Sequence, residues 1–550
     1  MARLDRLMTG KIIAPLGATI GRQFSYALLQ HVSQLDGLTL QRELGRLVEA
    51  ELVYQRGLPP QATYTFKHAL IQDAAYESLL KSTRQQYHNR IAQVLAAQFP
   101  ETAQAQPELL AHHCTAAGLM AQAVGYWQKA SQSAVQRSAY IEAIAHLRQG
   151  LALLETFPEI PERTRREVDM LISLGVSLNV TKGFGAPEVE QTFLRAQHLC
   201  EHLEAPHQLF PVLRGLWNHY LIRAELQRAE ALGEQLLSWA QHAQNLVRLV
   251  AARSCLGMTL MYLGAVTSAH THFIQSLALY DPQQHRAATF LYGGNAGVTC
   301  HSFNAWTLWF LGYPDQGLAQ SQQAVTLAQQ IAHPFCLAEA LFFAAMLHQF
   351  RREVRAAQER AEASIILFQE QGFPLWRAIG PLMRGWALAH QGQAQEGIAQ
   401  ITQGLRAFRA TGVEIGRPWR LALLAEAYSI MGQSEAGLTI LMEALTLAET
   451  TGERWCEPKL YRLKGALLLQ QSSDHHTEAE SCFHHALDIA RNQQAKSLEL
   501  RATTSLSKLW QQQGKRQEAH DLLAPVYNWF SEGFDTADLK NAKALLDELA

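Results

Sequence analysis

Four stretches of this 550-residue chain share one pattern around a glycine, and they decide the fold: MYLGAVTSA (261–269), WFLGYPDQG (309–317), AHQGQAQEG (389–397) and SIMGQSEAG (429–437). When Arg352 is counted as a fifth member, the central positions are separated by 48, 40, 40 and 40 residues. A small residue stands seven positions before each centre and another five positions after it, as Gly385 and Gly397 do around Gly392. Antiparallel helices pack closely only where small side chains face one another, and a glycine between them permits the sharp turn. The pattern therefore predicts repeated helical hairpins.

Further copies extend the pattern in both directions. QQQGKRQEA (511–519) repeats it, and a copy centred on Gly465 carries a two-residue insertion in QSSDHH (471–476). Two shorter elements precede the array, GLMAQAVGYWQKA (118–130) and SAYIEAIAHLRQG (138–150). Glycines at 372, 412 and 452, followed by prolines at 374, 418 and 458, mark the ends of second helices. We expect helix pairs from about residue 105 to 530.

The spacing resembles that of the tetratricopeptide repeat, whose period is about 34 residues. The resemblance implies an all-α fold, a right-handed α-solenoid with a longer repeat of about 40 residues. We divide the chain into a small domain (1–100), degenerate helical hairpins (101–260) and tetratricopeptide-like repeats (261–550).

The small domain has a different pattern. Residues 18–33 and 38–52 read as helices, LVYQRG-LPPQA-TYTFKHAL (52–70) as two β-rich runs around a Pro-Pro turn, and residues 71–99 as helix again. Helix, helix, hairpin, helix is the order of a winged helix, which suggests DNA binding. However, residues 41–52 carry three acidic and two basic residues, and a recognition helix should be more basic. A transcription regulator that binds DNA through this domain stays an alternative.

Composition excludes several classes. Lys and Arg (47) nearly balance Asp and Glu (49), and 48% of residues are hydrophobic. The chain is too apolar to be disordered and too neutral to bind nucleic acid by bulk charge. Its seven cysteines are scattered and never form C-x-x-C, which fits a reducing compartment. No apolar run reaches the ~18 residues that span a bilayer. We expect a cytoplasmic protein without a membrane partner.

Two stretches, YTFKHALIQDAAYESLL (64–80) and PELLAHH (107–113), resemble the C-terminal half of bacterial STAND-type signalling ATPases. Many of these carry an upstream class III adenylate/guanylate cyclase domain and an AAA-type ATPase. The resemblance implies that the winged helix packs on the nucleotide domain, and that His68, with Lys67 beside it, lies near the β-phosphate of the nucleotide. The alternative is that His68 simply caps the following helix.

Catalytic motifs are missing from the sequence. No G-x-x-x-x-G-K-[ST] loop occurs, because neither Gly10-Lys11 nor Gly514-Lys515 is followed by Ser or Thr. No paired metal-binding aspartates of a cyclase are evident. We therefore expect neither enzyme activity nor a bound cofactor, and an AAA-type nucleotide-binding domain supplied in cis or in trans. The chain begins within what reads as a helix, so we expect it to be the downstream part of something larger, or a remnant of an ATPase or cyclase. An enzyme hidden in the solenoid is a further alternative.

Aromatic and basic residues fall at positions that line the concave face of a tetratricopeptide solenoid. We expect this groove to bind a protein partner or a small inducer. The alternative is that several of these side chains pack between repeats. The predicted groove residues are Trp306, Trp309, Phe310, Phe342, Met346, Phe350, Trp386, Trp419, Lys459 and Arg462.

Two histidine-rich stretches contain residue types that could bind a metal ion. DHHTEAESCFHH (474–485) offers several metal ligands, but in the repeat register they spread around a helix instead of converging. His112 and His113 read as helix-packing residues. We expect no metal site.

Overall fold

The chain forms an all-α solenoid preceded by a small α/β region. The computed structural model describes residues 10–201, 206–285, 294–370 and 379–550. It divides into two compact units, residues 1–177 and 178–550, each of which is considered by itself. The first unit extends well beyond residue 100 because the helices that follow the small domain pack in series onto it, from α5 through α7 and α8 to α9.

The first unit begins with three short strands among helices. Its elements are α1 (Gly10–Ile20), β1 (Gln23–Ser25), α2 (Tyr26–Ser33), α3 (Gly37–Glu49), β2 (Val53–Arg56), β3 (Thr63–Phe66), α4 (Ala69–Glu77), α5 (Lys81–Gln98), α6 (Pro100–Ala105), α7 (Pro107–Ala117), α8 (Met120–Gln136), α9 (Tyr140–Leu154) and α10 (Pro161–Lys182), which continues into the second unit. The strands form an antiparallel sheet in the order β1-β3-β2.

The expected order of helix, helix, hairpin and helix is present, with two differences. The helix predicted over 18–33 is interrupted by β1, because Phe24 pairs with Tyr64 in the sheet and stacks on its ring at 5.8 Å. Ser25 then caps α2 by accepting a hydrogen bond from the amide of Leu28 at 3.1 Å. The helix predicted over 71–99 is two helices, α4 and α5, separated at residues 78–80.

Helix α3 buries one apolar face, and its two basic side chains pair with an acid of the same helix. Leu40, Leu44 and Leu47 are fully buried on one face of this helix. Glu43 is 2% exposed and lies 2.9 Å from Arg46 and 3.5 Å from Arg42. Both basic residues of the helix are therefore paired with an acid of the same helix.

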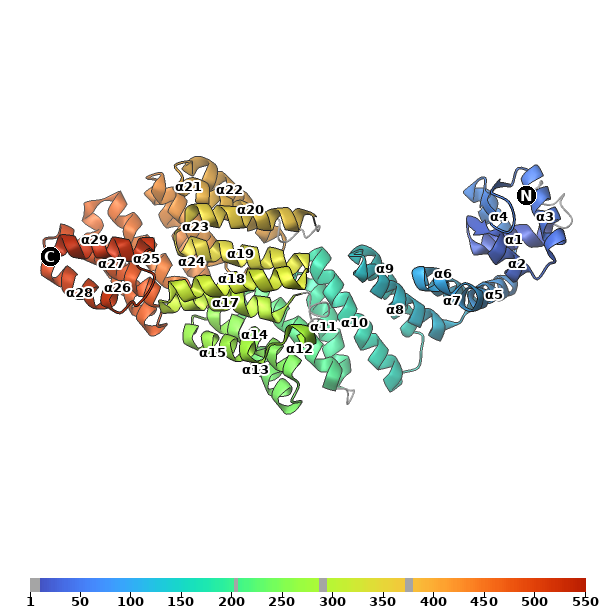
Figure 1. Ribbon diagram of the computed structural model, residues 1–550, viewed down its shortest axis with the longest axis horizontal. Helices are drawn as coiled ribbons and strands as arrows, with labels where there is room; N and C mark the ends of the chain where they lie inside the picture. Colours follow the sequence, from blue (N-terminus) through green and yellow to red (C-terminus); the bar gives the residue numbers. More distant parts are fainter. Residues whose placement is uncertain (1–9, 202–205, 286–293, 371–378) are drawn as a thin grey trace. The chain divides into compact units, whose positions relative to one another are not determined.

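The second unit is a succession of antiparallel helix pairs that follow one another in chain order (Figure 1). Its helices are α11 (Pro187–Glu201), α12 (Pro206–Ile222), α13 (Leu226–His242), α14 (Leu246–Tyr262), α15 (Val266–Leu279), α17 (Ala296–Leu311), α18 (Pro314–Ile331), α19 (Pro334–Phe350), α20 (Val354–Glu370), α21 (Ile379–His390), α22 (Ala394–Ala410), α23 (Arg417–Ile430), α24 (Ser434–Thr451), α25 (Glu457–Gln471), the 3₁₀ turn η2 (Ser473–His475), α26 (His476–Asn492), α27 (Lys496–Gln512), α28 (Arg516–Asn528) and α29 (Ala537–Leu549). Helix α29 lies beyond the expected end of the array at residue 530. None of the described helices is both long and apolar enough to cross a membrane.

The predicted turn positions have the backbone conformation that the pattern requires. Left-handed φ angles occur at Gly264, Gly312, Gly392, Gly432, Gly514 and Arg352. The small residues also face each other as expected, since a Cβ atom added to Gly385 would lie 2.6 Å from the carbonyl oxygen of Gly397. The repeat pattern is thus confirmed in geometry. Gly372 and Pro374 lie outside the described residues.

The solenoid turns tightly enough for its successive turns to touch. The carbonyl oxygen of Ile222, at the end of α12, accepts hydrogen bonds from the amides of Glu414 (2.9 Å) and Ile415 (3.1 Å). The carbonyl oxygen of Tyr262 accepts from Arg454 (2.9 Å) and Trp455 (3.3 Å) in the same way. Glu414 and Arg454 each lie 192 residues after their acceptors, just under five 40-residue repeats.

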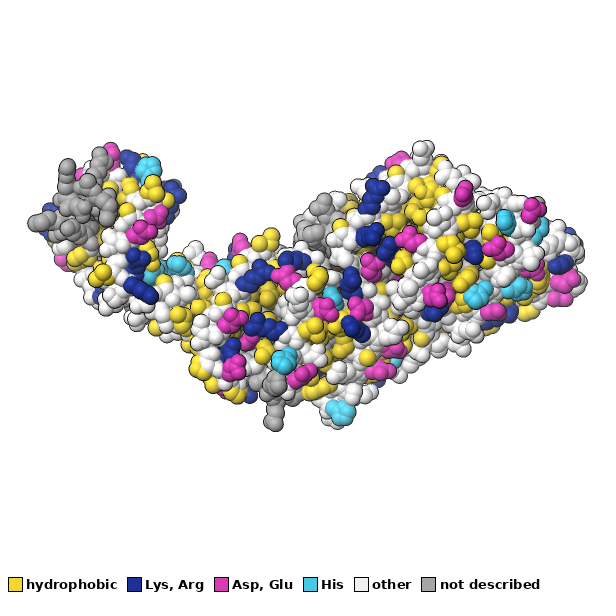
Figure 2. Space-filling model, turned by 180° about the vertical axis from the view of Figure 1, so that it is seen from behind, with side chains coloured by type: hydrophobic (Ala, Val, Ile, Leu, Met, Phe, Trp, Pro, Cys, Tyr) yellow, Lys and Arg dark blue, Asp and Glu magenta, His cyan; other side chains and the backbone are white. Residues whose placement is uncertain are grey.

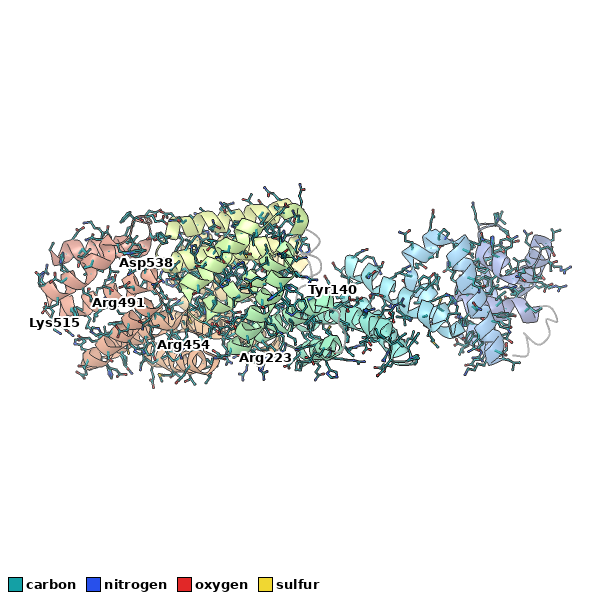
Figure 3. The ribbon with its side chains drawn as sticks, turned by 90° about the horizontal axis from the view of Figure 1, so that it is seen from below. Tyr140, Arg223, Arg454, Arg491, Lys515 and Asp538 are labelled. Carbon is teal, nitrogen blue, oxygen red and sulfur yellow. The ribbon has the colours of Figure 1, made fainter. Side chains whose placement is uncertain are left out.

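These contacts join the end of one helix to a link between two later ones. Figure 3 labels Arg223, next to Ile222, and Arg454, in the link between α24 and α25. Further along the chain, the side chains of Ser497 and Arg501 donate to the carbonyl oxygens of Trp309 and Phe350. The second turn therefore packs directly on the first.

Candidate functional site: an aromatic cavity inside the solenoid

A cavity of about 190 Å³ lies inside the second unit. The first helices of successive pairs, α12, α14, α17 and α19, supply much of its wall. Helices α21, α22 and α23 and the links before α11, α17, α23 and α25 supply the rest. The cavity exists because the contacts at Ile222 and Tyr262 bring the second turn against the first. Both turns therefore contribute to one site.

The wall is dominated by aromatic rings. Those that line the cavity are Phe184, Trp217, Tyr262, Phe303, Trp306, Phe335, Phe342, Phe343, Phe408, Trp419 and Trp455. Met258, Met346 and Met383 fill gaps between them. Such a lining suits an apolar ring, which can stack on several faces at once.

The predicted groove residues fall into three places. Four of them line the cavity, namely Trp306, Phe342, Met346 and Trp419. Trp309, Phe310 and Phe350 belong to an aromatic cluster beside it, and Trp386, Lys459 and Arg462 lie in a separate group of charged residues. Phe342 and Arg462 are half-buried and the other eight are buried, because the second turn covers part of the expected groove.

Trp455 is the centre of the aromatic cluster. This residue comes from the second turn, and its ring stacks on that of Trp306 at 6.0 Å and contacts Phe310 at 5.8 Å. Phe350 packs against both Trp309 (5.2 Å) and Trp455 (6.0 Å). The cluster thus joins first-turn and second-turn rings along one side of the cavity.

Several polar atoms in the cavity wall have no hydrogen-bond partner among the described residues. They include Oε2 of Glu339, a residue of α19 that is 8% exposed, Nε1 of Trp419, which is 4% exposed, and Nε of Arg420, which is 6% exposed. The second oxygen of Glu339 accepts a long hydrogen bond from Oγ1 of Thr299 at 3.4 Å. Burial raises the pKa of Glu339 to about 7, against the opposing effects of that bond and of the Arg214 charge.

Two further charged residues are Arg420, which belongs to the cavity wall, and Glu453, which contacts residues of the wall. Arg420 donates to the carbonyl oxygen of Ile415 at 2.7 Å, and its guanidinium lies 4.3 Å from the centre of the Phe408 ring. Glu453 accepts from the amide of Gly416 at 2.9 Å and from the indole of Trp455 at 2.6 Å. Burial raises the pKa of Glu453 to about 7. The charged groups in and behind the wall are therefore two arginines, Arg214 and Arg420, and two glutamates.

The separate charged group is built around Glu426. Its Oε2 atom accepts from Nε1 of Trp386 at 3.2 Å and lies 3.3 Å from Nζ of Lys459. Burial alone would raise the pKa of Glu426, but the positive charge of Lys459 and its neighbours outweighs burial and lowers the pKa to about 2. Arg501 pairs with Asp538 of α29 at 2.7 Å, and Figure 3 labels Asp538 near the C-terminal end. This group is a network of buried ion pairs.

The predicted nucleotide-sensing residues lie at the surface of the first unit. His68 is exposed at the N-cap position of α4, although its side chain makes no capping hydrogen bond. Lys67 lies 3.2 Å from Glu51 and 5.4 Å from the centre of the Tyr54 ring. His68 is therefore exposed just after the end of β3, with Lys67 half-buried beside it.

The histidine-rich stretches behave as packing elements. Nδ1 of His113 lies 2.8 Å from Nδ1 of buried His88, whose Nε2 lies 3.0 Å from the hydroxyl of Tyr76. Burial, reinforced by the neighbouring histidine, lowers the pKa of His113 to about 3. In α26, the ring of His485 meets that of Tyr461 edge-on at a centroid distance of 4.3 Å, while Cys482 is buried. In the part of the chain that the structure describes, no three His, Cys, Asp or Glu residues are grouped so as to hold a metal ion.

Comparison with known proteins gives distant similarities. No family model matches the chain. An uncharacterized protein of Rhizobium meliloti (strain 1021) is 24% identical over 512 residues, which cover 92% of this chain and 49% of that protein. The chain thus spans about half the length of this relative.

Among solved structures, the chain is similar to a Rap protein complexed with the competence and sporulation factor, with 11% identity, a TM-score of 0.47 and coverage of 78% of this chain and 99% of that one. It is also similar to the quorum sensor NprR from B. thuringiensis (12% identity, TM-score 0.42, 67% of this chain and 99% of that one). A third is a signal transduction ATPase with a tetratricopeptide repeat sensor from Pyrococcus horikoshii (11% identity, TM-score 0.34, 98% of this chain and 64% of that one).

Proposed function

We propose that this chain is the non-catalytic sensor region of a signalling ATPase. Its solenoid binds an inducer in the aromatic cavity, and its first unit is a winged-helix adaptor that couples this event to an AAA-type nucleotide-binding domain, in cis or in trans. The observation that carries the proposal is the cavity itself, a partly open aromatic space with unsatisfied polar atoms in its wall, built jointly by two turns of the solenoid.

The arrangement supports coupling on thermodynamic grounds. A ligand shifts a conformational equilibrium only by its differential affinity for the two states. Because the cavity exists only while the links before α23 and α25 touch Ile222 and Tyr262, a ligand in it favours the state in which these contacts are closed. A change in the spacing of the turns is then the signal that reaches the rest of the protein.

The surface of the first unit supports a protein partner better than DNA. Leu38, Leu58, Leu70 and Leu80 are 75–82% exposed, and Leu70 follows closely on His68. By contrast, both arginines of α3 are paired with Glu43, and on the face drawn in Figure 2 basic side chains are interspersed with acidic ones. Exposed leucines beside His68 are suited to a contact with the nucleotide domain.

The test uses the full chain and the ATPase domain encoded with it. We expect the chain alone to show no ATP hydrolysis and to bind this domain, and we expect Leu70→Asp to weaken binding at least tenfold. Ile141→Asp, at an equally exposed position on α9, is the matched control and should bind normally. Hydrolysis that co-purifies with the chain through every step, or salt-dependent binding of duplex DNA by the chain, would refute the proposal.

A further inference from the structure

The chemistry of the cavity wall restricts the ligand further, and this inference rests on the proposed role of the cavity as the inducer site. The first restriction is size. An apolar cavity of ~150 Å³ is known to take up benzene. At about 190 Å³, this cavity accommodates a six-membered ring with a short substituent. A helical or extended peptide of several residues exceeds this volume and could place no more than a single side chain in it.

The second restriction comes from two of the unsatisfied atoms, one an acceptor and the other an uncharged donor. Oε2 of Glu339 requires a hydrogen-bond donor, and Nε1 of Trp419 requires an acceptor. A hydroxyl group supplies both functions. Leaving either atom unpaired costs the full desolvation penalty of that group, so a ligand with a hydroxyl is favoured over one that has only an apolar ring.

The third restriction concerns the number of polar groups and the charge. Most of the other lining side chains are aromatic, methionine or aliphatic, so a sugar with five hydroxyls would bury several of them without partners. Above pH 7, where both carboxyls are largely ionised, the two arginines and two glutamates in and behind the wall balance each other in formal charge. A charged ligand would therefore place an uncompensated charge in a buried site.

We propose that the cavity binds an uncharged single-ring molecule carrying one or two hydroxyl groups, which donates a hydrogen bond to Glu339 and accepts one from Trp419. The ring lies among the aromatic side chains of α17, α19 and the Trp455 link. A hydroxyl that donates to Glu339 favours the ionised carboxylate, because hydrogen bonding to the charged form lowers a pKa. Binding is therefore tighter above pH 7 than at pH 5.5.

The experiment is isothermal titration calorimetry of the full chain with four probes: 2-phenylethanol, 2-phenylethylamine, phenylacetate and D-glucose. The first three share a ring and differ in head group, being neutral, cationic and anionic at pH 7.5. We expect 2-phenylethanol to bind at least tenfold more tightly than the amine and the acid, and D-glucose not to bind. Tighter binding of 2-phenylethanol at pH 7.5 than at pH 5.5 is also expected.

Three variants locate the contact. Glu339→Gln should weaken the binding of 2-phenylethanol by about tenfold and remove its pH dependence, and Trp419→Phe, which keeps a ring but removes the donor, should weaken it similarly. Trp510→Phe is the matched control, because Trp510 lies outside the cavity with its indole donating to Glu480 at 2.8 Å. It should bind as the unmodified chain does.

The outcomes separate the two proposals. Equal or tighter binding of the amine or the acid, or unchanged binding in both cavity variants, overturns the ligand class while leaving the cavity as a binding site. Tight binding of D-glucose overturns the argument from hydroxyl count. If no probe binds, both the ligand class and the role of the cavity fail. The comparison of head groups in the unmodified chain does not depend on any variant folding correctly.

Discussion

A close backbone contact between two helices of the solenoid offers a sharp test of the repeat packing. Gly385 in α21 and Gly397 in α22 face each other, so that a Cβ atom on Gly385 would lie 2.6 Å from the carbonyl oxygen of Gly397. The reciprocal distance, from a Cβ atom on Gly397 to the carbonyl oxygen of Gly385, is 2.5 Å. Ordinary contacts of a Cβ atom begin at about 3.4 Å. Gly385→Ala would thus force the two helices about 0.8 Å apart.

Two opposing effects set the change in the free energy of unfolding that this substitution causes. Replacing a mid-helix glycine by alanine stabilises an unstrained helix by ~0.8–1.0 kcal/mol. Overpacking a close contact costs ~1–3 kcal/mol, because the atom that is met here is backbone and cannot rotate away. We therefore expect a net destabilisation on the order of 1 kcal/mol for Gly385→Ala, and about twice that for Gly385→Val.

The control is Gly125→Ala in α8, where a Cβ atom would meet nothing within 4 Å. The same substitution should there raise the free energy of unfolding by up to ~1 kcal/mol. Urea unfolding followed by circular dichroism measures both, with the transitions of the two units fitted separately. The reasoning would be refuted if Gly385→Ala were as stable as, or more stable than, the unmodified chain, or if both substitutions shifted stability in the same direction.

Three further predictions concern charges and turns. Glu426→Gln leaves Lys459 buried without its counter-ion and should lower the free energy of unfolding by ~3–5 kcal/mol, whereas adding Lys459→Met should restore part of that loss in a double-mutant cycle. Because the pKa of Glu339 is raised from 4.5 to about 7, the folded state holds a proton there that the unfolded state releases, so stability should fall as pH rises from about 4.5 to 7. Urea titrations at several pH values should show a shallower decline for Glu339→Gln, and an unchanged slope would contradict the assignment. Gln244 is exposed with φ of 50°, so Gln244→Gly should raise the melting temperature slightly by relieving left-handed strain of ~1 kcal/mol, and a lower melting temperature would count against this.

The repeats could be predicted from sequence because their signal is local. A small residue, a turn residue and a second small residue within twelve positions are enough to identify a hairpin. One helical hairpin was not predicted from this pattern. Its turn lies at Ala224, where φ is 57°. It was missed because the turn residue is not glycine, and because the position seven residues earlier is the large Trp217. Its later small residue, Ala229, stands where the pattern requires it.

The cavity could not be predicted in the same way. The groove positions followed from the repeat register, and four of the ten predicted residues line the cavity. What encloses it is a contact between residues 192 positions apart, and nothing in a local pattern specifies the number of repeats in one turn. Glu339 was not predicted as a site residue for the same reason. On the inner face of an open groove, a glutamate is expected to be solvated, and its sequence position gives no sign of burial. Glycine and proline recur at 412–418 and 452–458, and from the sequence we interpreted them only as signals that a helix ends. In the structure, these two links between helices also form the contact between the turns.

The stacking of one turn on the next alters how this solenoid should fold and unfold. In most repeat proteins each unit touches only its neighbours, so stability is close to a sum of local terms and the ends can fray independently. Here the hydrogen bonds at Ile222 and Tyr262 join two repeats to repeats that lie almost five repeats later in the chain. The stability of a repeat therefore depends on its neighbours along the chain and on the repeat it contacts in the other turn. Loss of the C-terminal helices would destabilise the first turn as well as the second. Its folding also requires contacts of high sequence separation, which slows folding relative to an open array of the same length.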